Sequence, residues 1–294
     1  MMIISELKSQ MNKTKLSQYM GISRASIYYK RHEPVNRSRI SEYVEGQIIE
    51  LSKERITYGY RRIWAMLRNS GIRINAKTVY KVMKRHSLTL KRNEHKGRKS
   101  RKDLTKPKGP NELWEMDITY ISTKKEGMLY LFNIKDCFTK EWIAYLLTRT
   151  CNRRDAVKAL EEAYIEAFPN GKVEGLVLRT DNGPQFRARS FKEAVKILGM
   201  KQEYIEKSTP EDNGDIESFH GSIKADYIWP YEYEDYEEVE KAIKEAYKDY
   251  NTVRPHSTIG YLPPKEFKKR WEEDEKFREK YEEKINRKVR ISVS

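Results

Sequence analysis

The sequence predicts an α/β protein in which a mixed five-stranded sheet is flanked by helices and preceded by small all-helical segments. Three observations lead to this fold class. Three strand-like stretches follow one another between residues 113 and 148, and two further strands then alternate with helices up to residue 206. The first 110 residues contain only helical patterns and linkers. They also hold the whole basic excess, with 27 Lys and Arg against 8 Asp and Glu, whereas the other 184 residues carry 32 against 36.

This charge asymmetry indicates a polyanionic partner for the first third of the chain, and nucleic acid is the commonest one. A membrane surface is the alternative, but it requires a basic amphipathic helix with a large apolar face, and none is seen near the charge cluster. No apolar run approaches the roughly 18 residues of a membrane span, and residues 1–10 lack the features of a secretory signal. Because Cys137 and Cys151 form no disulfide framework, we expect a reducing, cytoplasmic compartment.

Residues 14–31 are predicted to form two short helices about a turn, within an N-terminal segment 1–35. Gly21 permits the bend, and Ser23 is a suitable N-cap for a second helix that carries Ile27. This is the shape of a helix-turn-helix, whose second helix can enter a major groove. A plain helical hairpin fits the pattern equally well.

A second helical domain is predicted over residues 38–90, with three helices in "VEGQIIELSKERI", "YGYRRIWAMLRNSG" and "NAKTVYKVMKRHSL". Gly71 ends the second helix, and Asn75 caps the third. The third helix has one apolar stripe (Val79, Val82 and Met83) and a basic remainder. A solvated basic face is the alternative to DNA binding, but the charge asymmetry favours DNA. The candidate DNA contacts in this domain are Arg61, Lys77, Lys81 and Lys84.

A basic linker is predicted over residues 91–109. Residues 91–108 contain nine Lys and Arg, and Leu104 is their one apolar residue, so this stretch cannot pack a core. We expect it to lie along phosphates when DNA is bound, which makes binding more dependent on salt. Without DNA, a free solvated linker is the expected state. The candidate contacts are Arg98, Lys99, Arg101 and Lys102.

From about residue 110 the pattern changes to strands and helices. "LWEMDITYI" alternates, with Trp114, Met116 and Ile118 on one face and Asp117 on the other, whereas "MLYLFNI" is continuously apolar, as a buried strand is. The predicted strands are 113–121, 128–134, 141–148, 173–180 and 201–206, with a small strand in the final "KVRISVS"; the helices are 155–168, 189–199, 216–229, 236–251 and 264–286; and a polar loop covers 208–215.

Three carboxylates occupy matching positions in this pattern. Asp117 lies inside a strand, where an ionisable residue is unusual and costs free energy unless it is paired or bound to metal. Asp181 follows the fourth strand in "LRTDNGPQF", and Glu217 begins a helix after the polar loop. Taken singly, Asp181 fits an ordinary strand-ending turn and Glu217 fits a surface helix.

Carboxylates that lie close together repel one another, and divalent cations relieve the repulsion. Mg²⁺ prefers oxygen ligands and keeps several waters, so few carboxylates suffice to hold it. Two such ions, about 3.5–4 Å apart, serve in-line phosphoryl transfer.

Thirty-five residues separate Asp181 from Glu217. This spacing resembles the DD(35)E signature of retroviral integrases and related transposases, and "WEMDITYI", "RTDNGPQF" and "DNGDIESFHGSIKADYI" resemble their three catalytic blocks. "YGYRRIWAMLRNSGIRINAKTVYKVMKRHSL" and "YNTVRPHSTIGYLPPKEF" are similar to flanking segments of bacterial insertion-sequence transposases made as OrfA/OrfB frameshift fusions, the IS-three family. The resemblance covers roughly residues 40–270 and identifies the chain with OrfB, the catalytic part.

The resemblance implies a ribonuclease-H-like catalytic domain over residues 110–270, followed by a charged helix or tail over 271–294. It implies nicking at transposon ends and strand transfer by the freed 3′-OH. Asp117 would bridge two Mg²⁺ ions, and Asp181 and Glu217 would each complete one; Mn²⁺ is expected to substitute. The implied partners are double-stranded DNA (terminal inverted repeats and target), further copies of the chain, at least as a dimer on DNA, and possibly a separate OrfA subunit. A bacterial cytoplasmic location at the nucleoid follows.

The resemblance also implies DNA contacts near the catalytic residues. Lys224 lies seven residues after Glu217 and therefore on the same helical face. For Arg254 and His256, a structural role is nearly as well supported as DNA contact, and Asn182 shapes the loop beside Asp181. His220 stays outside the predicted metal set.

No zinc module is expected, because the N-terminal third contains histidines (His32, His86 and His95) but no cysteine. Two other functions remain open at this point. One is a structure-specific nuclease of the same fold, and the other is a DNA-binding regulator derived from a transposase.

Overall fold

The computed structural model describes residues 13–21, 23, 40–90, 104–169, 171, 173, 175–205 and 214–283. The chain divides into two compact units, residues 1–42 and 43–294. The first contains helix α2 (Lys13–Met20), which ends at Gly21 with a positive φ of 61°, as the predicted bend requires. The helix predicted after Ser23, the linker residues Arg98, Lys99, Arg101 and Lys102, and the predicted C-terminal strand lie outside the described residues.

Three helices form what we call the helical module, residues 42–88. They are α4 (Glu42–Glu54), α5 (Tyr60–Asn69) and α6 (Ala76–Arg85). The predicted terminators are confirmed, because Gly71 has a φ of 88° and the Asn75 side chain accepts a hydrogen bond from the backbone N–H of Lys77 at 2.8 Å. The apolar stripes face one another and form a small core of Ile48, Ile63, Leu67, Val79, Val82 and Met83.

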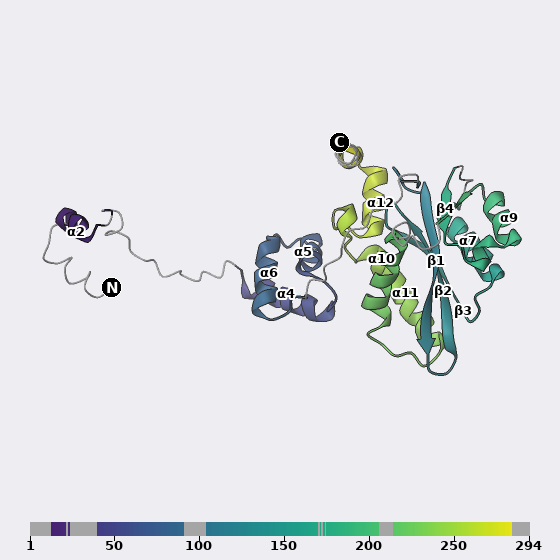
Figure 1. Ribbon diagram of the computed structural model, residues 1–294, viewed down its shortest axis with the longest axis horizontal. Coiled ribbons are helices and arrows are strands. Elements are labelled where there is room, and N and C mark those ends of the chain that lie inside the picture. The colour runs from purple at the N-terminus through teal and green to yellow at the C-terminus, as the bar shows by residue number, and fades with distance from the viewer. Residues whose placement is uncertain are drawn as a thin grey trace. The chain divides into compact units, whose positions relative to one another are not determined.

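The helical module belongs to the second compact unit, residues 43–294. The rest of that unit is built on a five-stranded mixed sheet, as predicted (Figure 1). The strand order is β3-β2-β1-β4-β5; β1 pairs antiparallel with β2, and β2 with β3, whereas β1–β4 and β4–β5 are parallel. The central strand is therefore β1. The bounds are β1 Leu113–Thr123, β2 Gly127–Asp136, β3 Trp142–Thr148, β4 Val177–Thr180 and β5 Lys201–Tyr204.

Helices cover both faces of the sheet (Figure 1). On one face, α7 (Arg153–Ala167) and α9 (Arg189–Ile197) pack against Trp114, Met116 and Ile118 of β1. On the other face lie α10 (Gly214–Ile223) and α11 (Tyr236–Thr252), which pack against Ile121, Leu129 and Leu131. The alternation predicted for β1 is confirmed, and it leaves Asp117 on the α10 side.

Two predicted helices differ from the structure in their details. The helix predicted over 264–286 is interrupted: α12 (Pro264–Glu273) ends at Asp274, whose side chain accepts the N–H of Phe277 and so begins a second helix over 275–283. The helix predicted over 216–229 is α10 followed by a π-helical stretch, η2 (Lys224–Ile228). Across the described helices, no segment combines the length and the apolar character needed to cross a membrane.

Candidate active site

Asp117 and Asp181 come from neighbouring parallel strands. The last pair in the register between β1 and β4 is Met116 with Thr180. Asp117 directly follows Met116, and Asp181 directly follows Thr180, so the two aspartates occupy corresponding positions on the two strands. Both side chains are half-buried. Burial raises the pKa of the Tyr120 hydroxyl, and the negative charges of Asp117 and Asp181 contribute to the increase.

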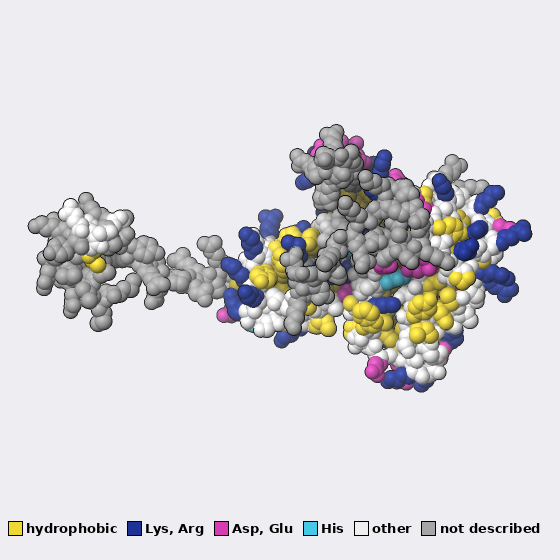
Figure 2. All heavy atoms as spheres, viewed as in Figure 1, with side chains coloured by type: hydrophobic (Ala, Val, Ile, Leu, Met, Phe, Trp, Pro, Cys, Tyr) yellow, Lys and Arg dark blue, Asp and Glu magenta, His cyan; other side chains and the backbone are white. Residues whose placement is uncertain are grey.

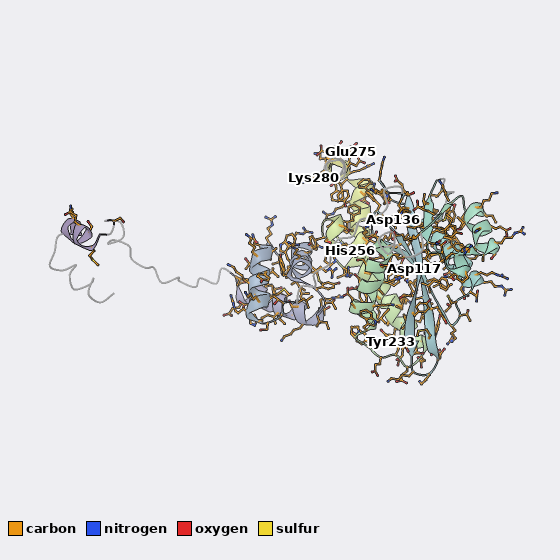
Figure 3. The ribbon with its side chains drawn as sticks, viewed as in Figure 1. Asp117, Asp136, Tyr233, His256, Glu275 and Lys280 are labelled. Carbon is orange, nitrogen blue, oxygen red and sulfur yellow. The ribbon has the colours of Figure 1, made fainter. Side chains whose placement is uncertain are left out.

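The Asp117 carboxylate, labelled in Figure 3, faces His220 of helix α10. Its Oδ1 accepts the N–H of Ile118 at 2.8 Å, and its Oδ2 lies 3.7 Å from Nδ1 of His220. The Asp117 side chain keeps one-fifth of its surface exposed, at 20%. One carboxylate oxygen is thus held by the backbone, and the other faces α10 with access to solvent.

His220 is a neutral imidazole whose tautomer follows from its neighbour Asn133. Burial, with the positive charges of Lys224 and Lys135, lowers the pKa of His220 to about 3. Asn133 pairs with Asp117 across β1 and β2, and its Nδ2 donates to the Leu131 carbonyl and contacts His220 Nε2, each at 3.1 Å. Because Nδ2 is a donor, Nε2 accepts, and the ring proton resides on Nδ1, which faces Asp117.

Asp181 lies in the turn that follows β4. Asp181 Oδ1 accepts the N–H of Gly183 at 2.9 Å. The Asn182 side chain donates to the carbonyl of Ile205, so it ties this turn to the end of β5. Residues 184–187, expected as loop, form the short helix α8 (Pro184–Arg187), which Pro184 begins.

Glu217 lies exposed in the first turn of α10. His220 follows it by three residues, hence on a neighbouring part of the helix surface, and faces Asp117. The three predicted carboxylates therefore belong to adjacent elements. Among the described residues, however, a different group has its potential metal-ligand atoms all within 4.8 Å of one another. This group is Glu115, Cys137 and Asp215.

That second group is an ion-pair network and fits a metal poorly. Lys135, which is fully buried, places its ammonium 3.1 Å from the Asp215 carboxylate and 3.0 Å from the Asp215 carbonyl, where a cation would otherwise bind. Burial opposes charge on both side chains, yet their mutual attraction outweighs it, raising the pKa of Lys135 and lowering that of Asp215 to about 2. Asp117, Asp181 and Glu217, in contrast, offer only oxygen ligands near solvent, which suits Mg²⁺.

Family models match most of the second unit. Two models described as an integrase core domain match residues 107–210 and 198–264, and a model of an HTH-like domain matches residues 39–96. The chain belongs to the integrase core domain family. The sheet described above is the core of that domain, and the helical module lies in the HTH-like domain.

Its sequence relatives come from bacterial insertion elements. The uncharacterized 31.7 kDa protein of element IS407 from Burkholderia multivorans is 26% identical over 88% of this chain and 91% of its own length. The uncharacterized 31 kDa protein of IS600 from Shigella sonnei is 28% identical over 87% and 98%. The transposase InsD of IS2 from Escherichia coli is 29% identical over 86% and 89%. The chain is thus a DNA transposase/integrase, a DDE polynucleotidyl transferase.

Solved structures with a similar chain trace include viral integrases and a transposase. The HTLV-2 integrase catalytic core domain in complex with magnesium has a TM-score of 0.40 and 22% identity, over 50% of this chain and 91% of that one. The catalytic domain of Mos1 mariner transposase has a TM-score of 0.40 and 15% identity, over 55% and 79%.

The residues predicted to contact DNA fall into two kinds in this integrase. Exposed basic side chains lie on the helical module, and Figure 2 shows Lys and Arg gathered on the visible face of α4–α6. Near the integrase core the residues are more buried: Lys224 is half-buried, and Arg254 is 2% exposed and bound through Nε to Asp226 at 2.8 Å. The exposed set comprises Arg61, Lys77, Lys81 and Lys84.

The sequence did not predict the ion pairs that Asp215, in the first turn of α10, forms with two lysines. Besides Lys135, the Lys140 ammonium contacts the Asp215 carboxylate at 2.5 Å, so two lysines attach the turn that carries Glu217 to the end of β2 and the turn after it. The available signal was a lysine directly after the mostly apolar strand sequence 128–134. Asn133 and His220 were also missed as neighbours of Asp117, because the sequence alone does not place α10 against β1.

Proposed function

We propose that Asp117, Asp181 and Glu217 are the catalytic carboxylates of this transposase, and that it nicks DNA at transposon ends and joins the freed 3′-OH to target DNA. The observation that supports this most strongly is the strand register. It sets Asp117 beside Asp181, while His220, on the helix of Glu217, faces Asp117.

These side chains would hold two Mg²⁺ ions, with Asp117 shared between them and Asp181 and Glu217 each completing one; Mn²⁺ would substitute. Such a pair of ions supplies activation of the attacking oxygen and stabilisation of the leaving oxygen during displacement at phosphorus. The donor set fits, because it contains only carboxylate oxygens and keeps access to solvent for the remaining ligands.

The protein's own contribution is to orient these carboxylates. The backbone N–H of Ile118 donates to Asp117, with His220 Nδ1 3.7 Å away on the α10 side, and the backbone N–H of Gly183 donates to Asp181. Ligand carboxylates that are held by neighbouring donors lose less freedom when a cation binds. Lys224, the first residue of η2 after α10, would contact the DNA backbone.

We further propose a division of labour along the chain. Residues 1–35 and 38–90 would bind transposon ends, 91–109 would follow the phosphate backbone, 110–270 would carry out catalysis, and 271–294 would form a charged tail. Because two ends must be held together, the active form on DNA would be at least a dimer, with a separate OrfA subunit as a further partner. Acting on chromosomal DNA, the protein would work in the bacterial cytoplasm at the nucleoid.

The test is the substitution Glu217→Gln, assayed on duplex DNA that carries the element's own terminal repeats, with Mg²⁺. We expect strand joining to fall by at least about a hundredfold, because an amide is a poorer metal ligand than a carboxylate, while end binding stays unchanged.

Glu237→Gln is the matched control, since Glu237 is also an exposed glutamate in the first turn of a helix, α11. This variant should join DNA at the normal rate. Joining by Glu217→Gln within about twofold of the control would refute the assignment of Glu217.

A further inference from the structure

A basic pocket lies where the helical module meets the integrase core. Its cavity has a volume of about 100 Å³. Its lining includes Arg62 from α5, Ser218 and Ser222 from α10, and Arg254 and His256, which follow α11. Ser218 is the residue directly after Glu217, so the pocket adjoins the proposed catalytic helix.

The positive charges around this pocket are not balanced by its one lining carboxylate. That carboxylate, Asp215, is already bound by Lys135 and Lys140, which also line the cavity. Arg62 has no carboxylate hydrogen-bonded to it within the described ranges, although it is largely enclosed and lies over the Tyr58 ring at 5.4 Å. Arg254 is paired with Asp226, whose negative charge also acts on Arg62. Arg62 itself has no hydrogen-bonded carboxylate among the described residues, so an anion in the pocket would compensate its charge.

Two buried polar atoms of the lining lack partners among the described residues. Arg254 binds Asp226 through Nε, but its Nη2 is buried without a hydrogen bond. Nε2 of His256, a residue labelled in Figure 3, is likewise buried without a hydrogen bond. A buried polar atom without a hydrogen bond costs about 1–3 kcal/mol, and the Arg254 Nη2 group is a donor that an anion can accept from.

We propose that this pocket binds one phosphate group of the DNA backbone. The Arg62 and Arg254 guanidiniums match the oxygens of a tetrahedral oxyanion, and the Ser218 and Ser222 hydroxyls can donate to it. The cavity is far smaller than the roughly 300 Å³ or more of a site for a drug-sized ligand, which restricts the ligand to a small anion. Free orthophosphate carries the same oxygens and could bind in the same way. The choice of a DNA phosphate as the ligand rests on the proposed function.

A phosphate held here would join two functions of the chain. Arg62 belongs to the helical module, and Ser218 belongs to the helix that carries Glu217. A DNA strand bound at this point would therefore fix the HTH-like domain and the catalytic helix on one backbone.

The first experiment measures the Tm of the full chain in orthophosphate and in chloride at equal ionic strength. Wild type should gain about 2–4 °C once phosphate exceeds its Kd several-fold, because a ligand that binds the native state stabilises it. Arg62→Gln should lose this gain. Lys158→Gln, which removes an exposed charge from α7 on the opposite face of the sheet, should keep it. An equal gain in Arg62→Gln would overturn the proposal.

The substitution Ser222→Asp is a second test, which is needed because Arg62→Gln could lose the phosphate response by misfolding. The new carboxylate would occupy the pocket next to the arginines, so we expect a higher Tm in chloride and no response to phosphate. A Ser222→Asp variant that still responds to phosphate as wild type does would also overturn the proposal.

The second experiment tests whether the bound phosphate belongs to DNA. It measures the salt dependence of binding to a DNA duplex of about 30 bp with random sequence. In Arg62→Gln, the slope of log K against log salt should fall by about one, and in Lys158→Gln it should not change. An unchanged slope together with a lost phosphate response would assign the pocket to free phosphate and overturn its assignment to DNA. Both readouts are independent of strand joining, so Glu217→Gln should preserve them even though it loses joining.

Discussion

The turn that presents Asp181 depends on the absence of a side chain at residue 183. A Cβ on Gly183 would lie 2.9 Å from Asp181 Oδ1 and would also collide with the Gln185 side chain. Gly183→Ala should therefore displace the Asp181 carboxylate. We expect strand joining to fall at least about tenfold, while the free energy of unfolding changes by less than about 1 kcal/mol, since both colliding groups are side-chain ends.

Gly46→Ala provides the control for this substitution. Gly46 is an exposed residue inside α4, and a Cβ there would meet nothing within 4 Å. Its replacement should stabilise the protein by about 0.5–1 kcal/mol and leave joining unchanged. Full joining activity in Gly183→Ala would show that the turn does not position Asp181.

At this scale, the sequence located the proposed catalytic residues but not what surrounds them. An aspartate inside a strand is unusual by itself, so Asp117 stood out locally, whereas Asp181 and Glu217 were singled out by the 35-residue spacing between them and the resemblance that it carries. The partner of Lys135 could not be found in this way, because Asp215 lies 80 residues away along the chain. Such pairings depend on the tertiary arrangement, which a single sequence does not display.

Hydrophobic periodicity predicted most of the helices and strands, because each buries one face. It failed where hydrogen bonding interrupts a continuous pattern. The apolar and charged spacing of 264–286 continues through Asp274, yet the Asp274 side chain starts a new helix. In the same way, the spacing of 216–229 does not reveal the widened turn of η2.

The attachment of α4 to α11 can be measured at the scale of elements. Arg55, just after α4, donates two hydrogen bonds to Asp249, at 2.9 Å and 2.7 Å, and both side chains are 19% exposed. In a double-mutant cycle with Arg55→Gln and Asp249→Asn, we expect a coupling free energy of about 2 kcal/mol from urea unfolding, because the pair is bidentate and largely desolvated.

The pair Lys158–Glu162 on α7 is the comparison for this cycle. It is an exposed pair with a 3.8 Å separation, and its coupling should be about 0.3–0.5 kcal/mol. If the Arg55–Asp249 cycle gave no more than this exposed pair, the attachment would contribute little to holding the helical module on the core.

At the scale of the whole molecule, composition predicts that DNA binds to the first third of the chain. The basic excess lies in the first 110 residues, and the exposed Lys and Arg of the helical module lie outside its apolar core. Composition could not predict the pocket beside Ser218, since its lining comes from α5, α10 and the segment after α11. Lys135 and Lys140 add the end of β2 and the turn after it, so segments that are distant in the sequence meet there only after folding.

The most direct test of the central claim is anomalous diffraction from crystals of the chain with terminal-repeat DNA and Mn²⁺. The account predicts anomalous peaks within coordination distance of Asp117, Asp181 and Glu217, with Asp117 shared between two ions. A peak at Glu115, Cys137 and Asp215, with none between Asp117 and Asp181, would contradict it.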